Sequence, residues 1–315
     1  MKNYRNIWIL GGTGFIGSAL VRHLSQDASN RLHLLIHKTT AYQQLETVNT
    51  ISGSLGSIEG FWLERYPPDV VFHLARPAGS MAITRSLAAW QGEKSNTRLV
   101  KILAALPRPP VVVYVSGSLM YGQRHKDHPA NENSALAPDS FARYYFRSEK
   151  PWLEAWQHSV LDVRFARPGW IAGPRSWFRE FFWKPWQATG KVPCYGDGSQ
   201  LMSLIHLDDC ARMINALWEY GVPGQNLNIL AEPPLRQEVF CNIMAEAINA
   251  HIEKISFERL RRLHGSTVAR ALTTSIPMET LYPDIREKAG IQYPEPRALL
   301  IDTIRFLKNK QGILS

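Results

Sequence analysis

The sequence has few cysteines and no apolar run long enough to cross a membrane. Its three cysteines, Cys194, Cys210 and Cys241, stand far apart and lack the C-x-x-C spacing of a metal or redox site. This argues against a disulfide framework or a cysteine-built metal site, and predicts a cytoplasmic protein without a metal. The first expected strand begins within a few residues of Met1, so we expect neither a cleavable signal nor a membrane partner.

Repeats and low-complexity segments are also lacking. Charged residues make up 20% of the chain and hydrophobic residues 45%, which is typical of a folded globular protein. The formal net charge of +9 favours anionic partners such as phosphorylated cofactors or acyl carriers. The basic residues form no basic–aromatic stripe, so we expect no specific nucleic-acid partner.

A glycine-rich stretch, residues 11–17, separates the apolar run 7–10 from a helical pattern over 18–24. Its glycines allow a sharp turn and a close approach of backbone N–H groups to a pyrophosphate, which the start of a helix attracts. An ordinary tight turn is the alternative, but strand, spacing and helix together favour a dinucleotide-binding loop. The cofactor residues expected here are Gly11, Thr13, Gly14, Phe15, Ile16 and Gly17.

Further apolar strands alternate with helical segments. Strands are expected at 32–37, 50–51, 69–75, 111–116 and 161–166, with helices over 83–106 and 140–157. This alternation predicts an α/β Rossmann fold, in which a doubly wound parallel sheet binds ligands at the carboxyl ends of its strands. Beyond Gly169 the composition turns strongly aromatic, which marks the start of a second lobe.

Residues at the later strand ends complete the predicted cofactor site: Ser54, Leu55, Leu74, Ala75, Arg76 and Pro168. The strand at 32–37 leads into His37 and Lys38, where dinucleotide-binding folds usually carry an acid for the ribose 2′-OH. A cation there would attract a 2′-phosphate, so we predict NADP(H), with NAD(H) as the alternative. Lys38 as a plain surface lysine is the other interpretation.

Several motifs in order resemble the extended short-chain dehydrogenase/reductase family, in its NAD-dependent epimerase/dehydratase group. Beside the glycine loop they lie at 72–75, 115–122, 150–154, 167–174, 196–198 and 205–209, within residues 7 to about 231. The resemblance implies a Rossmann domain over 1–168 and 205–231 and a smaller, mainly C-terminal substrate lobe over 169–204 and 232–315. It also implies hydride transfer with a nicotinamide cofactor, and a homodimer, which many members form.

The catalytic part of the resemblance shows two departures. In the family, a Ser or Thr hydroxyl and the tyrosine of a Tyr-x-x-x-Lys motif polarise a carbonyl, and the lysine binds the nicotinamide ribose. Lys150 matches that lysine, but Phe146 stands four residues before it and Gly117 takes the hydroxyl position. Tyr145 would reach the site only through an irregular turn near Pro151. The catalytic candidates are Ser116, Ser118, Tyr145 and Lys150, the last also a cofactor residue.

Two further positions bear on the substrate. Sugar-nucleotide members of the family usually have Asn where Trp170 stands and Arg where Met202 stands. Neither side chain present here can pair with a diphosphate. The aromatic stretch over 170–186 therefore predicts a pocket for an apolar or aromatic small molecule, with lobe core as the alternative for individual residues. The expected substrate contacts are Tyr121, Trp170, Trp177 and Met202.

These observations predict an NAD(P)-dependent oxidoreductase or isomerase that acts on a hydrophobic carbonyl or alcohol. One alternative is a sugar-nucleotide epimerase or dehydratase, which is common in the family. Another is a dinucleotide-binding protein without catalytic chemistry, which Phe146 and Gly117 suggest.

Overall fold

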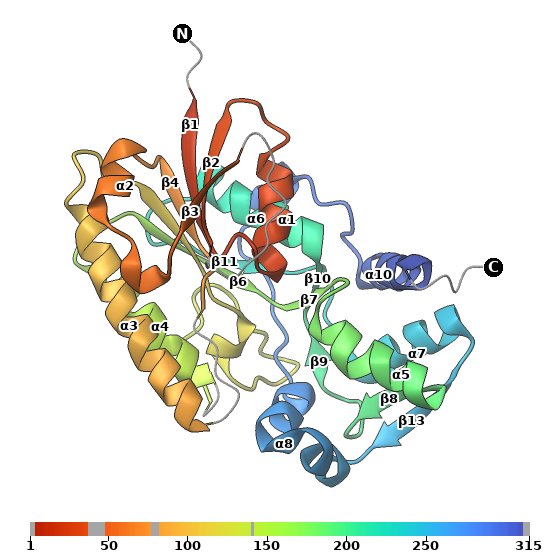
Figure 1. The fold of residues 1–315 in the computed structure, drawn as a ribbon. Coiled ribbons are helices and arrows are strands. Elements are labelled where there is room, and N and C mark those ends of the chain that lie inside the picture. The colour runs from red at the N-terminus through yellow and green to blue at the C-terminus, as the bar shows by residue number, and fades with distance from the viewer. Residues whose placement is uncertain (1–3, 37–47, 77–81, 140–141, 311–315) are drawn as a thin grey trace.

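A parallel sheet forms the centre of the molecule (Figure 1). The computed structural model describes residues 4–36, 48–76, 82–139 and 142–310. Seven strands pair in the order β11-β6-β5-β4-β1-β2-β3, each parallel to its neighbours. Their bounds are Arg5–Leu10 (β1), Asn30–Ile36 (β2), Val48–Ser52 (β3), Val70–His73 (β4), Val111–Val115 (β5), Val163–Pro168 (β6) and Asn226–Ile229 (β11). The strand order reverses between β1 and β4, which is the point where such sheets bind ligands.

Helices cover both faces of the sheet, because side chains along each strand alternate between two cores. In β1, Ile7 and Ile9 enter the core under α1, α6 and α9, whereas Trp8 and Leu10 enter the core under α2, α3 and α4. These helices span Phe15–Leu24 (α1), Gly60–Arg65 (α2), Ala82–Ala104 (α3), Ala142–Gln157 (α4), Leu207–Tyr220 (α6) and Pro283–Ala289 (α9). The predicted α/β Rossmann fold with a doubly wound parallel sheet is confirmed.

A third core lies beside the sheet and is rich in aromatic side chains, among them Phe178, Phe182 and Phe240. It is formed by elements that follow residue 169: β7 (Trp170–Ala172), the π-helical turn η3 (Arg179–Trp183), α5 (Lys184–Thr189), β8 (Lys191–Tyr195), β9 (Leu201–Met202), β10 (Leu204–His206), β12 (Leu235–Arg236), α7 (Gln237–Ile248), β13 (His251–Ile255), α8 (Phe257–Thr273) and α10 (Pro296–Lys310). The exact division of the chain at 168/169, 204/205 and 231/232 stays a prediction.

The expected elements lie close to those observed. The helices predicted over 83–106 and 140–157 correspond to α3 and α4, and the strand over 161–166 corresponds to β6. His37 and Lys38 lie outside the described residues, directly beyond the end of β2. Within the described ranges, no helix is both long and apolar enough to cross a membrane.

The start of α1 depends on a close backbone approach at Gly17. A Cβ at this position would lie 2.1 Å from the Gly11 carbonyl oxygen, and backbone cannot move aside as a flexible side chain can. We expect Gly17→Ala to lower the free energy of unfolding by roughly 2 kcal/mol or more. The matched control is Gly60→Ala in α2, where the nearest atom would be 3.8 Å away. Urea unfolding followed by tryptophan fluorescence compares the two, and equal stability would refute the prediction.

The fully buried His73 makes stability depend on pH. Burial lowers its pKa to about 4, so the unfolded chain binds a proton at this residue near pH 6.5 while the folded chain does not. Its contribution is constant above pH 6.5 and is lost as the pH falls from 6.5 toward 4, by up to about 1.4 kcal/mol per pH unit. His73→Gln removes this titration. We expect wild type to lose stability relative to the variant over that range in unfolding titrations, and parallel pH curves would contradict the prediction.

Candidate active site

The loop after β1 brings two strand ends together. Gly11 has a φ of +89°, and a Cβ there would lie 2.8 Å from the Ala75 amide nitrogen at the end of β4. The loop then turns into α1, whose N-cap residue Gly14 provides no side-chain hydrogen bond. The first turn of α1 holds no acidic residue. The helix start therefore offers uncapped N–H groups and a positive dipole end to an anion.

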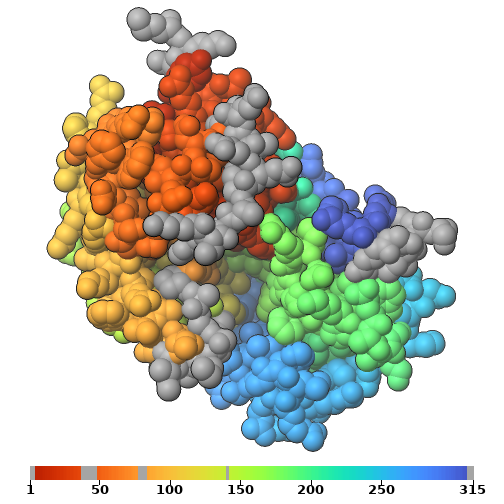
Figure 2. Space-filling model, viewed as in Figure 1, coloured from red at the N-terminus to blue at the C-terminus, as the bar shows by residue number. Residues whose placement is uncertain are grey.

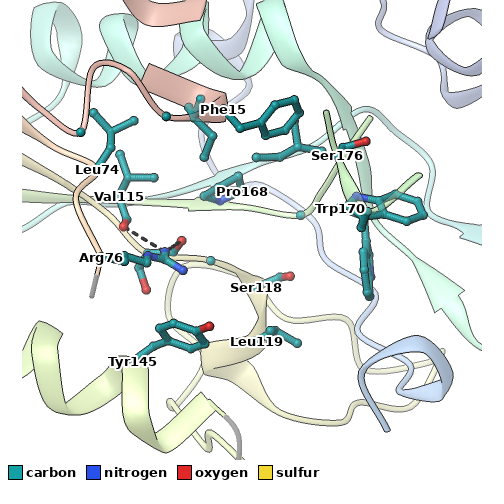
Figure 3. A pocket seen from close by; sticks show the side chains of 18 of the residues that line it. Phe15, Leu74, Arg76, Val115, Ser118, Leu119, Tyr145, Pro168, Trp170 and Ser176 are labelled. Carbon is teal, nitrogen blue, oxygen red and sulfur yellow. Dashed lines mark hydrogen bonds between the residues drawn. The ribbon is translucent and has the colours of Figure 1, made fainter. Parts of the chain in front are cut away.

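Two cavities meet at this loop. The first has a volume of about 410 Å³ and extends past the ends of β4, β5 and β6 to Trp170 and Trp177 (Figure 3). The second, of about 430 Å³, lies toward β2 and β3 and is lined by Leu35 among others. Gly11 and Arg76 line both. In the space-filling view, the surface is hollowed between the orange N-terminal half and the green residues of the aromatic lobe (Figure 2).

The predicted cofactor residues are distributed over both cavities. The first is lined by Gly11, Gly14, Phe15, Ile16, Gly17, Leu74, Arg76 and Pro168. The second is lined by Gly11, Thr13, Ser54, Leu55, Ala75 and Arg76. A long ligand with a phosphate-bearing middle, such as a dinucleotide, fits this arrangement because the glycine loop lies between two hollows. The 2′-phosphate prediction rests on His37 and Lys38, which lie outside the described residues.

Of the catalytic candidates, Ser116, Ser118 and Tyr145 line the first cavity. Lys150 is not among the lining residues, and its assigned role stays a prediction: its side chain is 56% exposed and its Nζ lies 3.5 Å from Glu154 Oε1. The reason is the rotation of α4, a continuous helix that includes Pro151. With Tyr145 facing the cavity, position 149 faces the same way one turn later, and position 150 is turned about 100° away. Tyr145 reaches the cavity without an irregular turn.

Sequence reasoning missed the buried polar cluster beneath the cavity. The Glu149 and Arg167 side chains are each 1% exposed, and Arg167 Nη2 lies 2.6 Å from Glu149 Oε1. Ser116 Oγ donates a hydrogen bond of 2.6 Å to Glu149 Oε2 and accepts one of 3.1 Å from Arg167 Nη1. The hydroxyl hydrogen of Ser116 is thus directed at Glu149 and away from the cavity. Two features of the sequence could have indicated the cluster. Glu149 is a charged residue one helical turn after Tyr145, and Arg167 is a charged residue within an apolar strand.

This cluster leaves Ser118 as the hydroxyl donor beside Tyr145. Ser118 is buried at the start of η2 (Ser118–Tyr121), and its side chain makes no hydrogen bond to any residue that the structure describes. Gly117, at the family's usual hydroxyl position, also lines the cavity and contributes no side chain.

Arg76 connects three elements at the junction of the cavities. It follows β4, and its Nη2 donates hydrogen bonds to the carbonyl oxygens of Val115, at 3.0 Å, and Ser116 (Figure 3). The guanidinium carbon lies 5.2 Å from the centre of the Tyr145 ring. Arg76 thereby holds the ends of β4 and β5 against α4.

The far end of the first cavity is aromatic. Trp170 and Trp177 line it, with ring centres 4.6 Å apart in an edge-to-face arrangement. Arg175 also lines the cavity and donates a hydrogen bond of 3.1 Å to Ser18 Oγ in α1. Across the described ranges, no three His, Cys, Asp or Glu side chains gather as metal ligands would.

Two predicted substrate residues do not line this cavity. Tyr121 is 1% exposed, its hydroxyl donates to Asn228 Oδ1 at 2.8 Å, and burial raises its pKa to about 12. Met202 is 2% exposed and packs in the aromatic core, because β9 turns it toward Phe240 and its neighbours. The prediction that these two residues contact substrate stays a prediction, and their burial away from the cavity does not support it. The alternative of lobe core holds for Phe178, Phe182 and Trp183, which are fully buried.

Known proteins resemble this chain in sequence and in fold. The model of the NAD dependent epimerase/dehydratase family matches residues 7–229. The dTDP-glucose 4,6-dehydratase of Neisseria gonorrhoeae is 26% identical over 257 residues, covering 71% of this chain and 72% of the relative. The dTDP-glucose 4,6-dehydratase of Salmonella typhimurium is 26% identical over 331 residues, covering 89% of this chain and 91% of the relative.

Two solved structures show the shared fold. The dTDP-glucose 4,6-dehydratase from Bacillus anthracis, in complex with NAD, superposes with a TM-score of 0.76 at 17% identity and covers 98% of each chain. The human epimerase family protein SDR39U1, with NADPH, superposes with a TM-score of 0.73 at 18% identity, covering 95% of this chain and 99% of the other.

The neighbours Glu149 and Lys150 provide a matched pair of substitutions. Glu149→Ala would leave Arg167 as a buried charge without its carboxylate, so we expect a loss of about 3–5 kcal/mol in the free energy of unfolding. Lys150→Ala removes only an exposed ion pair, with an expected change within about 0.5 kcal/mol. Urea denaturation measures both. Similar effects of the two substitutions would disprove the assigned rotation of α4.

Proposed function

The chain belongs to the NAD dependent epimerase/dehydratase family, a family of enzymes, and from this premise we propose that it binds NAD(P) across its two cavities and transfers a hydride to or from a substrate held in the first. The observation that carries the proposal is the junction at Gly11 and Arg76, where the glycine loop separates two hollows of similar volume, about 410 and 430 Å³. The reacting end of the cofactor belongs in the first cavity, beside Tyr145 and Ser118.

The residues present fit such a cofactor. The uncapped start of α1 suits the pyrophosphate, and the second cavity combines apolar Leu35, Leu55 and Ala75 with the small polar Ser54, as suits an adenosine. When bound, the nicotinamide supplies the hydride donor or acceptor. We include the preference for NADP(H) in the proposal on the basis of His37 and Lys38, with NAD(H) as the alternative.

Side chains of the protein then bind the substrate oxygen and exchange a proton with it. The Tyr145 hydroxyl is the group that can give or take a proton, and Ser118 donates a hydrogen bond that orients the oxygen. Ser116 does not take this role while its hydrogen is held by Glu149. The ring pair Trp170–Trp177 favours a carbonyl or alcohol with an apolar or aromatic body.

A sugar-nucleotide epimerase or dehydratase is the second candidate. The relatives named above support it, and Arg175 places a cation at the aromatic end of the same cavity. A guanidinium is well suited to a diphosphate. Buried Met202, where such members usually have arginine, speaks against it.

Cofactor titration is the first test of the proposal. NADH and NADPH are added separately to nucleotide-free protein, and energy transfer from tryptophan to the bound nicotinamide is followed. We expect saturable binding, tighter for NADPH. Tighter NADH binding would overturn the preference for NADP(H), and binding of neither would overturn the proposed function.

Substrate screening then separates the candidates. Stabilisation by dTDP- or UDP-sugars in thermal unfolding would favour the second candidate, whereas turnover of apolar ketones or aldehydes supports the first. In whichever assay gives turnover, Tyr145→Phe should lower kcat by roughly 10²–10⁴-fold, and Lys150→Ala should leave it unchanged. A Tyr145→Phe variant at full rate would show that the proton passes through another group.

A further inference from the structure

Helix α4 presents no cation to the cavity that Tyr145 lines. Its described basic residues are Arg143, Arg147 and Lys150, and all three are exposed. Arg147 Nε lies 2.5 Å from Glu93 Oε2, and Lys150 pairs with Glu154. One turn after Tyr145, on the inward face, stands the carboxylate of Glu149, which is bound by Arg167 and Ser116. Any positive charge next to Tyr145 must therefore come from another element.

Arg76, which follows β4, supplies this positive charge. Resting on the proposed function, we propose that Arg76 contacts the bound dinucleotide directly and at the same time positions Tyr145, so that cofactor and proton-transferring group are held by one guanidinium. The chemical groups it would recognise are the oxygen acceptors of the nicotinamide ribose and of the adjoining phosphate.

The donors of Arg76 are divided in a way that fits both tasks. An arginine has five N–H donors in a planar fork. Nη2 is used on the Val115 and Ser116 carbonyl oxygens, which fix the plane of the group. Nε and Nη1 make no hydrogen bond to residues within the described ranges, and the side chain borders both cavities. Nη2 is thus anchored to the two carbonyl oxygens, and the Nε and Nη1 donors remain available to a ligand.

Arg76 lies where the two cavities join, so a dinucleotide bound across both cavities passes beside it. Among the described residues, Gly11 and Arg76 are the two that line both cavities, so a ligand extended from one cavity to the other passes them. Gly11 has no side chain, which leaves Arg76 as the polar side chain at this crossing. A charge-assisted hydrogen bond there would be stronger than a neutral one.

The second task, positioning, follows from the ring contact. The guanidinium lies over the Tyr145 ring with 5.2 Å between its carbon and the ring centre. This contact restrains the ring plane, and with it the direction of the hydroxyl, as long as the two backbone carbonyls hold the guanidinium. A lysine lacks the planar fork, so it cannot make the carbonyl contacts, the ring contact and the ligand contact together.

The test compares Arg76→Ala with Arg85→Ala. Arg85 is the matched control because its guanidinium carbon lies 5.9 Å from the ring centre of Tyr144, the sequence neighbour of Tyr145. It lines neither of the two cavities that meet at the glycine loop, although it shares a small cavity with Arg76 and Tyr145. Binding of NADH and NADPH is measured by energy transfer from tryptophan. We expect Arg76→Ala to weaken binding by roughly 10- to 100-fold, and Arg85→Ala to change it less than about threefold.

Chemical rescue separates direct contact from a structural role. Guanidinium ion at low, non-denaturing concentration should restore cofactor binding to Arg76→Ala by filling the vacated site, and should not affect Arg85→Ala. Arg76→Lys should bind more weakly than wild type, because it lacks the planar fork. If Arg76→Ala does not fold, Arg76→Gln, which keeps an amide donor toward the two carbonyls but lacks the charge, takes its place in the comparison.

The outcomes distinguish this inference from the proposed function. If wild type binds the cofactor and Arg76→Ala binds it equally well, the inference is overturned and the proposed function stands. Weaker binding that guanidinium does not restore would reduce Arg76 to a structural residue, which also overturns the inference. If wild type binds neither NADH nor NADPH, the proposed function itself fails.

Discussion

The buried ion pair between Glu149 and Arg167 determines how helix α4 is rotated against the sheet. A carboxylate in the interior is stable only with its partners in place, so the pair fixes the inward face of α4 against β6. Tyr145 follows, one turn earlier on the same face, and Lys150 is left in solvent. Ser116 at the end of β5 joins the pair, which connects helix and sheet beneath the cavity floor. The inward position of Tyr145 and the direction of the Ser116 hydroxyl hydrogen both follow from this one interaction.

Much of the fold could be predicted from the sequence, and the reason is local. The strand β1, the glycine loop and α1 follow one another without interruption, so periodicity and turn chemistry identify them together. The cofactor residues predicted at the strand ends lie at the two cavities because parallel strands end at one edge. Their arrangement needed no knowledge of long-range contacts.

The residues that face the cavity from α4 could not be predicted from the sequence, since a shift of one residue along a helix rotates the side chain by about 100°. Matching Lys150 to the family's lysine placed Phe146 inward, whereas the structure turns Tyr145 and Glu149 inward. The ion pair with Arg167 in β6 decides which of these two faces of α4 is turned inward. Tyr121 and Met202 show the same limit of chain position. Both follow motifs of the site, but Tyr121 bonds to Asn228 and Met202 packs in the aromatic core.

Because the two cavities share part of their lining, binding in one cavity is coupled to binding in the other. Gly11 and Arg76 border both, so a fragment bound in either hollow restrains atoms that the other hollow needs. The conformational entropy lost in this shared lining is then lost once for the whole ligand, not once for each half. If the two halves of a ligand are measured as separate molecules, the sum of their binding free energies is therefore less favourable than the binding free energy of the intact ligand. For such a site, linkage between the halves of the ligand is itself a source of affinity.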